Sequence, residues 1–373
     1  MVDPSPLHSG HYRATRPHLV RLNPNFVEDF WEYIGHTPTI SRFYPHFLAP
    51  QAYRARQRVL DAIKRWHAYA REHSDYRQNG PEDPDWDEYW GSKCLKVRQQ
   101  WGQDTGEMDD DALASDDLAV ITATSANALP ASFWNLIEIY NDRNLLGRVQ
   151  HTLSETTVAS DGNTAAETLP LRFDLAHTLS SPLLQSVYAE VLRQRVSLFH
   201  NRAPTVGDYK LGPFTLRNGG LVCVPTNIAH NSEKAWGPGR TERPLGEFWP
   251  ERFLVPADGK EGEGNPDTAE VRFSTEGLDG AWIPYGGGAL MCPGRHLAKI
   301  KMLGSVSVFS AYFDMEVLNG APCMDDAFFG MGSQPPGEPV PVRLRRKVGD
   351  VGVSASGRKN RAPSVWFFHE QYH

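Results

Sequence analysis

The sequence predicts a mainly α-helical fold with small β-sheets. Apolar residues recur at helical spacing over residues 50–73, which is typical of an amphipathic helix, and Ser181 followed by Pro182 marks the start of another helix. Short runs punctuated by glycine and proline, at 209–225 and 329–346, are typical of hairpins. Hydrophobic residues make up 40% of the 373 residues, enough for a sizeable core in one large or two medium domains.

Composition excludes several functional classes. A net charge of −7 argues against nucleic acid as a main partner. The 4 cysteines are widely spaced and form no CxxC or His/Cys cluster, so neither a disulfide framework nor a zinc site is indicated. No run approaches the roughly 18 apolar residues of a membrane span, and the first residues lack the apolar core of a signal peptide. We therefore expect the chain as written to be soluble or peripheral to a membrane.

Two helices are expected in the first hundred residues, a short one around 25–34 and a longer one over 50–73. The longer segment places its apolar side chains on one face, as an amphipathic helix over a core requires. These side chains are Tyr53, Val59, Leu60, Ile63, Trp66 and Tyr69. Residues 74–92 are rich in proline, glycine and acidic side chains and are predicted to form a polar loop.

A single long helix is predicted from about Asp110 to Tyr140. Its first turn is acidic, which is favourable at the positive end of the helix dipole. Its middle, residues 119–133, is small and apolar, as expected of a helix that is buried on most sides. Pro130 cannot donate to the carbonyl of Ala126, so the helix should distort there and leave that carbonyl free.

A second well-marked helix begins at Ser181, a capping residue that is followed by Pro182. It carries Glu190 and Arg193, which are three residues apart and share a face. An exposed pair of this kind is usually only a surface feature worth a few tenths of a kcal/mol. Residues 255–269 are predicted to be an acidic flexible loop.

Residues 281–299 carry the most informative stretch of the chain. Three consecutive glycines lead to Cys292 and Pro293, and Pro293 suits the first position of a helix over 293–313. A thiol at a helix N-terminus favours the thiolate form, and the glycines let the backbone approach a large flat group. The stretch therefore predicts a presented thiolate ligand, and haem iron accepts one axial thiolate. The alternative is a buried glycine turn with an inert cysteine.

The spacing of Tyr285, Gly288, Cys292 and Gly294 resembles the cysteine-loop signature of the cytochrome P450 superfamily. Leu290 departs from it, since most members carry a basic residue there that holds a haem propionate. A branch that includes sterol 7α-hydroxylases and prostacyclin synthase resembles this variant. The resemblance implies a cytochrome P450 fold and haem whose iron is ligated by Cys292.

Two further motifs support this resemblance. Glu190 and Arg193 resemble the Glu-x-x-Arg helix motif of the family, and Arg252, within Trp249 to Phe253, resembles the arginine that joins that pair. If buried, these three groups would lock the proximal side of the haem loop. Arg202 stands where similar proteins place an arginine that binds a propionate, and a plain loop arginine is an equal alternative.

The distal segment 124–134 resembles the same branch. Most family members place an acid and an alcohol here to deliver protons to bound dioxygen. In this chain Asn127 takes the acid position and Ala128 the alcohol position. Alanine carries no proton and makes no side-chain hydrogen bond, so Thr124, Ser125 or an ordered water would have to substitute.

The resemblance implies a haem-thiolate monooxygenase that oxidises a hydrophobic small molecule: a sterol, a lipid or a secondary metabolite. Electrons would come from NADPH-cytochrome P450 reductase, at the cytoplasmic face of the endoplasmic reticulum membrane. Two alternatives remain: a haem-thiolate isomerase or dehydratase that needs no reductase, motivated by Ala128, and a truncated non-catalytic remnant. Family members are longer before the distal helix, so we expect a fold that lacks its N-terminal part, with a partial domain over 1–347 and a flexible tail over 348–373.

Overall fold

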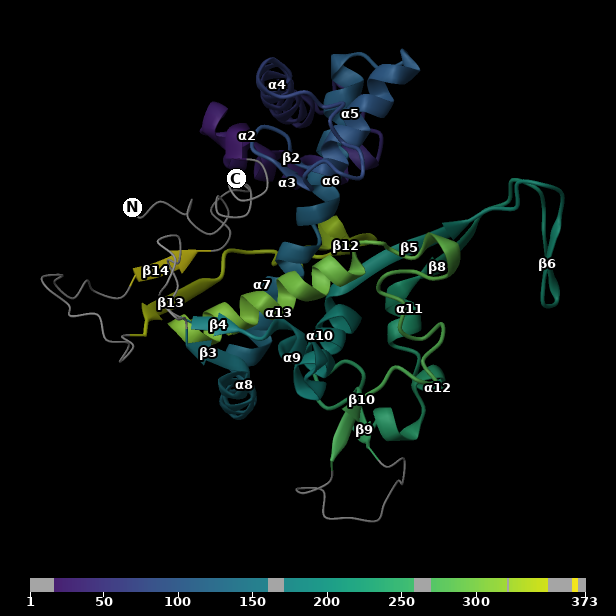
Figure 1. Cartoon of the computed structure of the whole chain (residues 1–373). Coiled ribbons are helices and arrows are strands. Elements are labelled where there is room, and N and C mark those ends of the chain that lie inside the picture. The colour runs from purple at the N-terminus through teal and green to yellow at the C-terminus, as the bar shows by residue number, and fades with distance from the viewer. Residues whose placement is uncertain (1–16, 160–170, 258–269, 321, 348–363, 368–373) are drawn as a thin grey trace, which may run out of the picture. The chain divides into compact units, whose positions relative to one another are not determined.

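The computed structural model describes residues 17–159, 171–257, 270–320, 322–347 and 364–367. The chain divides into two compact units, the first ending at Ala126 and the second beginning at Asn127. Helices dominate both units and the sheets have two or three strands each (Figure 1). The prediction of a mainly α-helical fold with small sheets is therefore confirmed.

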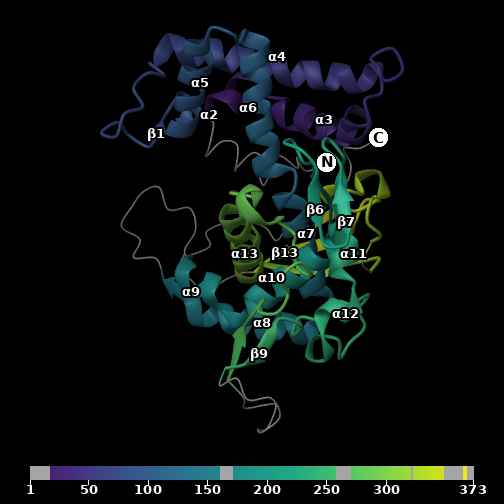
Figure 2. The same ribbon diagram turned by 90° about the vertical axis from the view of Figure 1, so that its right-hand side faces the viewer.

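The first unit is built on a pair of long helices, α3 and α4, which run side by side (Figure 2). Its elements are α2 (Pro17–Leu22), α3 (Phe26–Ser41), α4 (Pro50–His73), β1 (Trp86–Asp87), β2 (Gly91–Ser92), α5 (Lys93–Thr105) and α6 (Asp110–Ser125). Helix α4 has the predicted bounds, and Val59, Leu60, Ile63 and Trp66 on its apolar face are buried. The predicted apolar face is thus the face that packs.

Other features of the first unit differ from the sequence prediction. Helix α3 continues to Ser41, well beyond the short helix that the sequence predicts. The predicted polar loop 74–92 contains a small hairpin of β1 and β2. Helix α5 has no counterpart in the prediction because two of its four buried residues, Lys96 and Gln99, are polar. Its inward face therefore does not give the apolar periodicity that marks a helix in a sequence.

The long helix predicted over 110–140 is wrong as a single element. The structure has two helices, α6 and α7 (Ala128–Asn141), with a break at Ala126 and Asn127. The break precedes Pro130, whose ring would clash with the carbonyl four residues earlier in a continuous helix. Pro130 is instead the third residue of α7, where its missing N–H would have no intrahelical partner. The predicted distortion near Pro130 is therefore present, but the helix is fully interrupted there and not merely bent.

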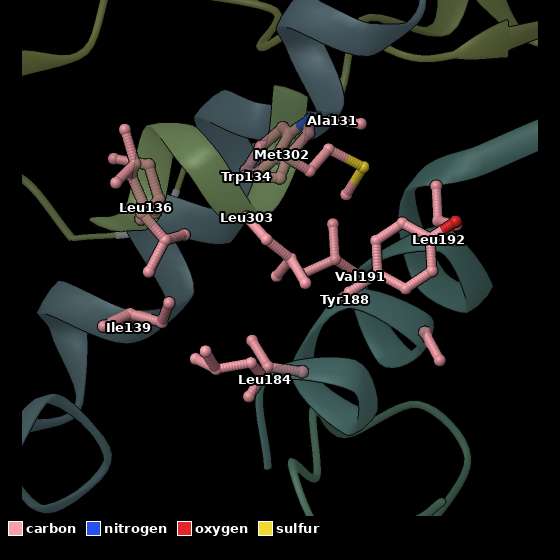
Figure 3. Packing of buried hydrophobic residues seen from close by; sticks show 14 of the residues in the cluster. Ala131, Trp134, Leu136, Ile139, Leu184, Tyr188, Val191, Leu192, Met302 and Leu303 are labelled. Carbon is pink, nitrogen blue, oxygen red and sulfur yellow. The ribbon is translucent and has the colours of Figure 1, made fainter. Parts of the chain in front are cut away.

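The core of the second unit lies between three helices, α7, α10 (Pro182–Arg195) and α13 (Arg295–Tyr312). Figure 3 shows their buried side chains meeting: Ala131, Trp134, Leu136 and Ile139 of α7, Leu184, Tyr188, Val191 and Leu192 of α10, and Met302 and Leu303 of α13. Helix α10 has the predicted start, since the Ser181 hydroxyl caps it by accepting a hydrogen bond from the Leu184 N–H. This helix is the element on which the site below is built.

Small sheets and short helices surround these three helices. They are α8 (Arg143–Thr156), β3 (Thr157–Ala159), β4 (Leu171–Phe173), α9 (Leu175–Ser180), β5 (Val196–Arg202), β6 (Tyr209–Leu211), β7 (Phe214–Leu216), β8 (Val222–Pro225), α11 (Thr226–His230), α12 (Glu233–Trp236), η1 (Pro238–Arg240), β9 (Leu254–Pro256), β10 (Val271–Phe273), η2 (Gly288–Leu290), β11 (Phe313–Val317), η3 (Asp326–Phe328), β12 (Met331–Ser333), β13 (Pro341–Arg346) and β14 (Ser364–Phe367). Among the described residues, two sheets have three strands, in the orders β12-β5-β8 and β11-β13-β14. All described pairings are antiparallel.

Both predicted hairpins of the second unit need correction. Within 209–225 only β6 and β7 form a hairpin, whereas β8 pairs with β5. Segment 329–346 is not a hairpin, because β12 pairs with β5 while β13 pairs with β11. The prolines between β12 and β13, at 335, 336 and 339, have no N–H with which to extend a ladder between them.

Two predicted loops fall largely outside the described residues. Residues 258–269 of the predicted acidic loop are not described, nor is the predicted tail except for β14, which pairs with β13. None of the helices in the described residues combines the length and the hydrophobicity of a membrane span.

Candidate functional site

Cys292 lies on a tight glycine loop and is exposed. Gly286 and Gly288 have φ values of 73° and 66°, in the left-handed region that residues other than glycine rarely adopt. The Cys292 N–H donates to the Tyr285 carbonyl at 3.0 Å, which closes the loop. An ideal Cβ at Gly287 or Gly288 would meet no atom within 4 Å, so this side of the loop is open. The thiol is therefore presented on a closed backbone turn.

The helix that follows begins later than the sequence predicts. Pro293 does not occupy the first helical position, because Gly294 is the N-cap residue and Arg295 is the first residue of α13. Arg295 contacts the carbonyl oxygen of Cys292, through its backbone N–H at 3.5 Å and its guanidinium Nη1 at 3.0 Å. The start of α13 thus holds the backbone of Cys292.

Glu190, Arg193 and Arg252 form a fully buried charge cluster on helix α10 and the segment that carries Arg252. Glu190 accepts hydrogen bonds from Arg193 at 2.7 and 2.8 Å and from the Nε of Arg252 at 3.0 Å. The backbone N–H of Trp249 donates to the same carboxylate at 3.1 Å. All three charged side chains are at most 1% exposed. The structure therefore brings together the three residues that the sequence motifs single out.

The cluster holds two positive charges against one negative charge. Backbone carbonyls supply the remaining acceptors: Arg193 donates to those of His230 and Leu245, and Arg252 donates to those of Arg240, Arg243, Pro244 and Glu247. Burial lowers the pKa of the Arg252 guanidinium from its ordinary value, and the nearby Glu190 opposes this shift. The segment 240–247 thus solvates the cluster in place of water.

Two histidines hold the peptide groups of Ile283, at the entrance to the loop. The imidazole of His230 accepts from the Ile283 N–H at 3.1 Å through Nε2, and its Nδ1 donates to the Arg193 carbonyl at 2.9 Å. The Nε2 of His200 donates to the Ile283 carbonyl at 3.1 Å. These partners assign opposite tautomers to the two rings. Burial lowers the pKa of His230 to about 4, which keeps the ring neutral.

Two aromatic side chains of the loop contact α10. The indole N–H of Trp282 donates to the Ala189 carbonyl at 3.1 Å. The hydroxyls of Tyr285 and Tyr188 are 2.8 Å apart. Burial raises the pKa of Tyr285 to about 12, so its hydroxyl stays protonated at neutral pH. The loop is therefore attached to α10 on either side of Ile283.

Arg202, the predicted propionate partner, ends strand β5 and is exposed. Its guanidinium Nη1 donates to the Asn201 carbonyl at 2.8 Å. Among the described residues, no carboxylate lies within ion-pair distance of it. The cation is thus available to a ligand, and its role stays a prediction.

The predicted distal residues fall on both sides of the unit boundary. Thr124 belongs to the first unit, and its hydroxyl donates to the Val120 and Ile121 carbonyls at 3.0 Å each. Asn127 and Ala128 start the second unit, and Ala128 is buried. The Oδ1 of Asn127 accepts from the Ser333 N–H at 2.9 Å. The oxygen of the Asn127 amide is therefore committed to strand β12.

Replacing Gly332 with alanine should detach Asn127 from β12. Gly332 has a φ of 131°, and an added Cβ would lie 2.0 Å from the Asn127 Oδ1. We expect a loss of roughly 2–4 kcal/mol in the free energy of unfolding, from backbone strain and a displaced hydrogen bond. Chemical denaturation measures it. In an Asn127→Ala background, which removes the clashing atoms, the cost of Gly332→Ala should be smaller, and an equal cost would contradict this account.

Comparisons with known proteins decide the family. The sequence model of the family described as Cytochrome P450 matches residues 20–340. The chain belongs to the cytochrome P450 family. The predicted family is thus confirmed.

Individual cytochrome P450 proteins add detail. Cytochrome P450 monooxygenase fsoE of Humicola fuscoatra is 35% identical over 346 residues, which are 89% of this chain and 59% of fsoE. Cholesterol 7-alpha-monooxygenase of Cricetulus griseus is 21% identical, over 87% of this chain and 59% of that protein, in line with the resemblance to sterol 7α-hydroxylases. The chain thus spans 59% of the length of each of these curated relatives. Among solved structures, retinoic acid bound cyanobacterial CYP120A1 shares the fold with a TM-score of 0.55 and 20% identity, over 88% of this chain and 64% of that one.

Membership of the cytochrome P450 family implies haem with a cysteine thiolate ligand, and the donor set fits this group. Among the described residues, no group of three or more His, Cys, Asp or Glu side chains could hold a bare metal ion. A single exposed thiol suits a metal that brings its own in-plane ligands, as haem iron does. The open side of Gly287 and Gly288 leaves room for a flat group against the backbone.

Sequence reasoning missed the residues that attach the cysteine loop. Tyr188 and His230 lie in no motif, and His200 stands in an ordinary strand. The sequence offers one hint for Tyr188: it lies on the same helix as Glu190, and the Glu-x-x-Arg motif identifies that helix. The contacts themselves join residues 53 to 97 positions apart, so no local pattern indicates them.

Proposed function

We propose that this chain is the haem-binding part of a cytochrome P450 monooxygenase that oxidises a hydrophobic small molecule, with Cys292 as the residue that would ligate the haem iron. The observation that carries the proposal is the exposed Cys292 thiol on a closed glycine loop, backed by the buried cluster of Glu190, Arg193 and Arg252. When bound, haem supplies the redox chemistry that inserts an oxygen atom from dioxygen into the substrate.

The residues of this chain have distinct parts in that function. Cys292 would hold the iron, and its backbone is fixed by Tyr285 and Arg295. Arg202 binds a haem propionate, since its guanidinium is exposed and lacks a carboxylate partner among the described residues. On the distal side Ala128 offers no proton, so protons reach the site through water held by the side-chain amide of Asn127, whose N–H groups have no hydrogen-bond partner among the described residues.

The names of the relatives support the substrate class. The relative from Humicola fuscoatra is named a monooxygenase, and that from Cricetulus griseus is named for cholesterol, a hydrophobic molecule. A sterol, a lipid or a secondary metabolite is therefore the proposed substrate class. We further propose NADPH-cytochrome P450 reductase as the source of electrons and the cytoplasmic face of the endoplasmic reticulum membrane as the location.

Replacing Cys292 with alanine should abolish the thiolate-ligated Soret band of the reduced, carbon monoxide-bound protein. The experiment adds haem to the purified chain, reduces it and records the absorption spectrum. Cys223→Ala is the matched control, because Cys223 is also an exposed cysteine of the second unit, and it should leave the band unchanged. A thiolate band that survives in Cys292→Ala would show that the ligand assignment is wrong. The absence of any band in the unsubstituted chain with excess haem would favour a non-catalytic protein.

A second candidate is a haem-thiolate isomerase or dehydratase that acts on a peroxide. Ala128 favours it, because its buried methyl group cannot take part in delivering protons to dioxygen. The two functions differ in their need for electrons. Turnover of a hydroperoxide without NADPH and reductase would support the isomerase, and strict dependence on NADPH would support the monooxygenase.

A further inference from the structure

Tyr188 and Tyr285 form a hydroxyl pair directly behind the cysteine loop. The two oxygens are 2.8 Å apart. Tyr188 projects from α10 into the core of the second unit (Figure 3) and is buried, and Tyr285 packs against the same core. Within the described residues, neither hydroxyl has another hydrogen-bond partner. Since an unpaired buried hydroxyl costs free energy, each of the two hydroxyls depends on the other.

The backbone of Tyr285 is at the same time the hydrogen-bond partner of Cys292. Its carbonyl accepts from the Cys292 N–H at 3.0 Å. A chain of two hydrogen bonds therefore runs from the backbone of Cys292 through Tyr285 to Tyr188 on α10. The other attachments lie further from the cysteine: Trp282, ten residues before it, bonds Ala189 of α10, and Ile283, nine residues before it, bonds His230 of α11. The tyrosine pair differs from these attachments because one of its members, Tyr285, is also the hydrogen-bond partner of Cys292.

We propose that Tyr188 and Tyr285 are positioning residues that latch the cysteine loop to α10 through their hydroxyls. The inference rests on the proposed function, in which Cys292 ligates haem iron. Helix α10 also carries Glu190 and Arg193 of the buried cluster, so the latch ties the ligand to the helix that anchors this cluster. Removing either hydroxyl frees the turn from Tyr285 to Cys292 and leaves the packing of both rings in place.

The test is hydrogen exchange of the Cys292 amide in the haem-free chain. Tyr188→Phe, Tyr285→Phe and the double variant keep both rings and remove one or both hydroxyls. Each single variant should speed exchange in the peptide that contains Cys292 by about two- to tenfold, the effect of one lost hydrogen bond. Because the hydroxyls act as one pair, the double variant should exchange no faster than the singles.

Tyr140→Phe is the matched control. The Tyr140 hydroxyl is also bonded, to the Phe313 carbonyl at 3.0 Å, but it lies on α7 and should leave exchange at Cys292 unchanged. Exchange in α10 reports whether each variant is folded. Unchanged exchange at Cys292 in the folded single variants, or additive effects in the double variant, would overturn the latch.

A second readout uses the haem-loaded protein. In the single variants the thiolate-ligated Soret band of the reduced, carbon monoxide-bound state should convert to the thiol-ligated form about two- to tenfold faster than in the parent chain. If the parent chain shows no thiolate band while exchange at Cys292 still responds, the proposed function fails and the latch stands. If the band is present and neither its lifetime nor exchange responds, the latch fails alone.

Discussion

Glu190→Gln is expected to lower the free energy of unfolding by about 3–5 kcal/mol, because it leaves the buried guanidiniums of Arg193 and Arg252 without a counter-charge. The glutamine has nearly the volume of glutamate and keeps one oxygen acceptor, so the loss reports the charge rather than the packing. Chemical denaturation of the purified chain measures it. The same substitution should also impair haem retention, since the cluster lies on the helix to which the cysteine loop is attached.

Glu276→Gln provides the matched control for this prediction. Glu276 pairs with Arg272 at 3.4 Å on the surface, with the two side chains 81% and 47% exposed. Loss of a surface pair of this kind costs about 0–1 kcal/mol, because water and salt screen it. Equal small effects of the two substitutions would refute the view that the carboxylate of Glu190 offsets the charges of the cluster.

Because of His230, the free energy of unfolding should fall by about 3 kcal/mol as the pH is lowered from 6.5 to 4. The unfolded chain takes up a proton on this ring near pH 6.5, whereas in the folded protein burial lowers the pKa to about 4. Between these values the unfolded state binds more protons, so the stability of the folded protein falls as the pH falls. The stabilising contribution of neutral His230 is complete above pH 6.5. Arg193 and His200, which face the ring, also disfavour its protonation.

His230→Gln separates this contribution from those of other titrating groups. Glutamine can donate to the Arg193 carbonyl and accept from the Ile283 N–H but does not titrate. Free energies of unfolding measured from pH 7.5 to 4 should fall less steeply in the variant than in the parent chain. Parallel profiles for the two proteins would mean that His230 is not the group responsible.

The sequence predicts some helices well because their signals are local. Helix α4 has a continuous apolar face, and α10 begins at a serine cap and a proline. Helix α5 escapes prediction because it buries Lys96 and Gln99, whose polarity hides the periodicity. The break between α6 and α7 is harder still, since Pro130 indicates a distortion without saying whether the helix bends or stops.

The site shows the same division between local and distant signals. The motif resemblance predicts that Arg252 joins Glu190 and Arg193, and these three groups do meet. It does not predict the carbonyls of 240–247 that complete the cluster, because backbone acceptors carry no side-chain signature. The partners of His200 and His230 are equally hidden, since they are the peptide groups of Ile283.

The attachment of the loop through main-chain atoms has a consequence for protein engineering. The N–H and carbonyl of Ile283, the N–H of Cys292 and the carbonyl of Tyr285 are present whatever side chains those positions carry. A library that varies the side chain at 283 should therefore retain the attachment, whereas side chains at 200 or 230 that cannot form these hydrogen bonds should lose it. Within such a library, the side chain at 283 can be selected for new properties independently of the positions that hold the loop in place.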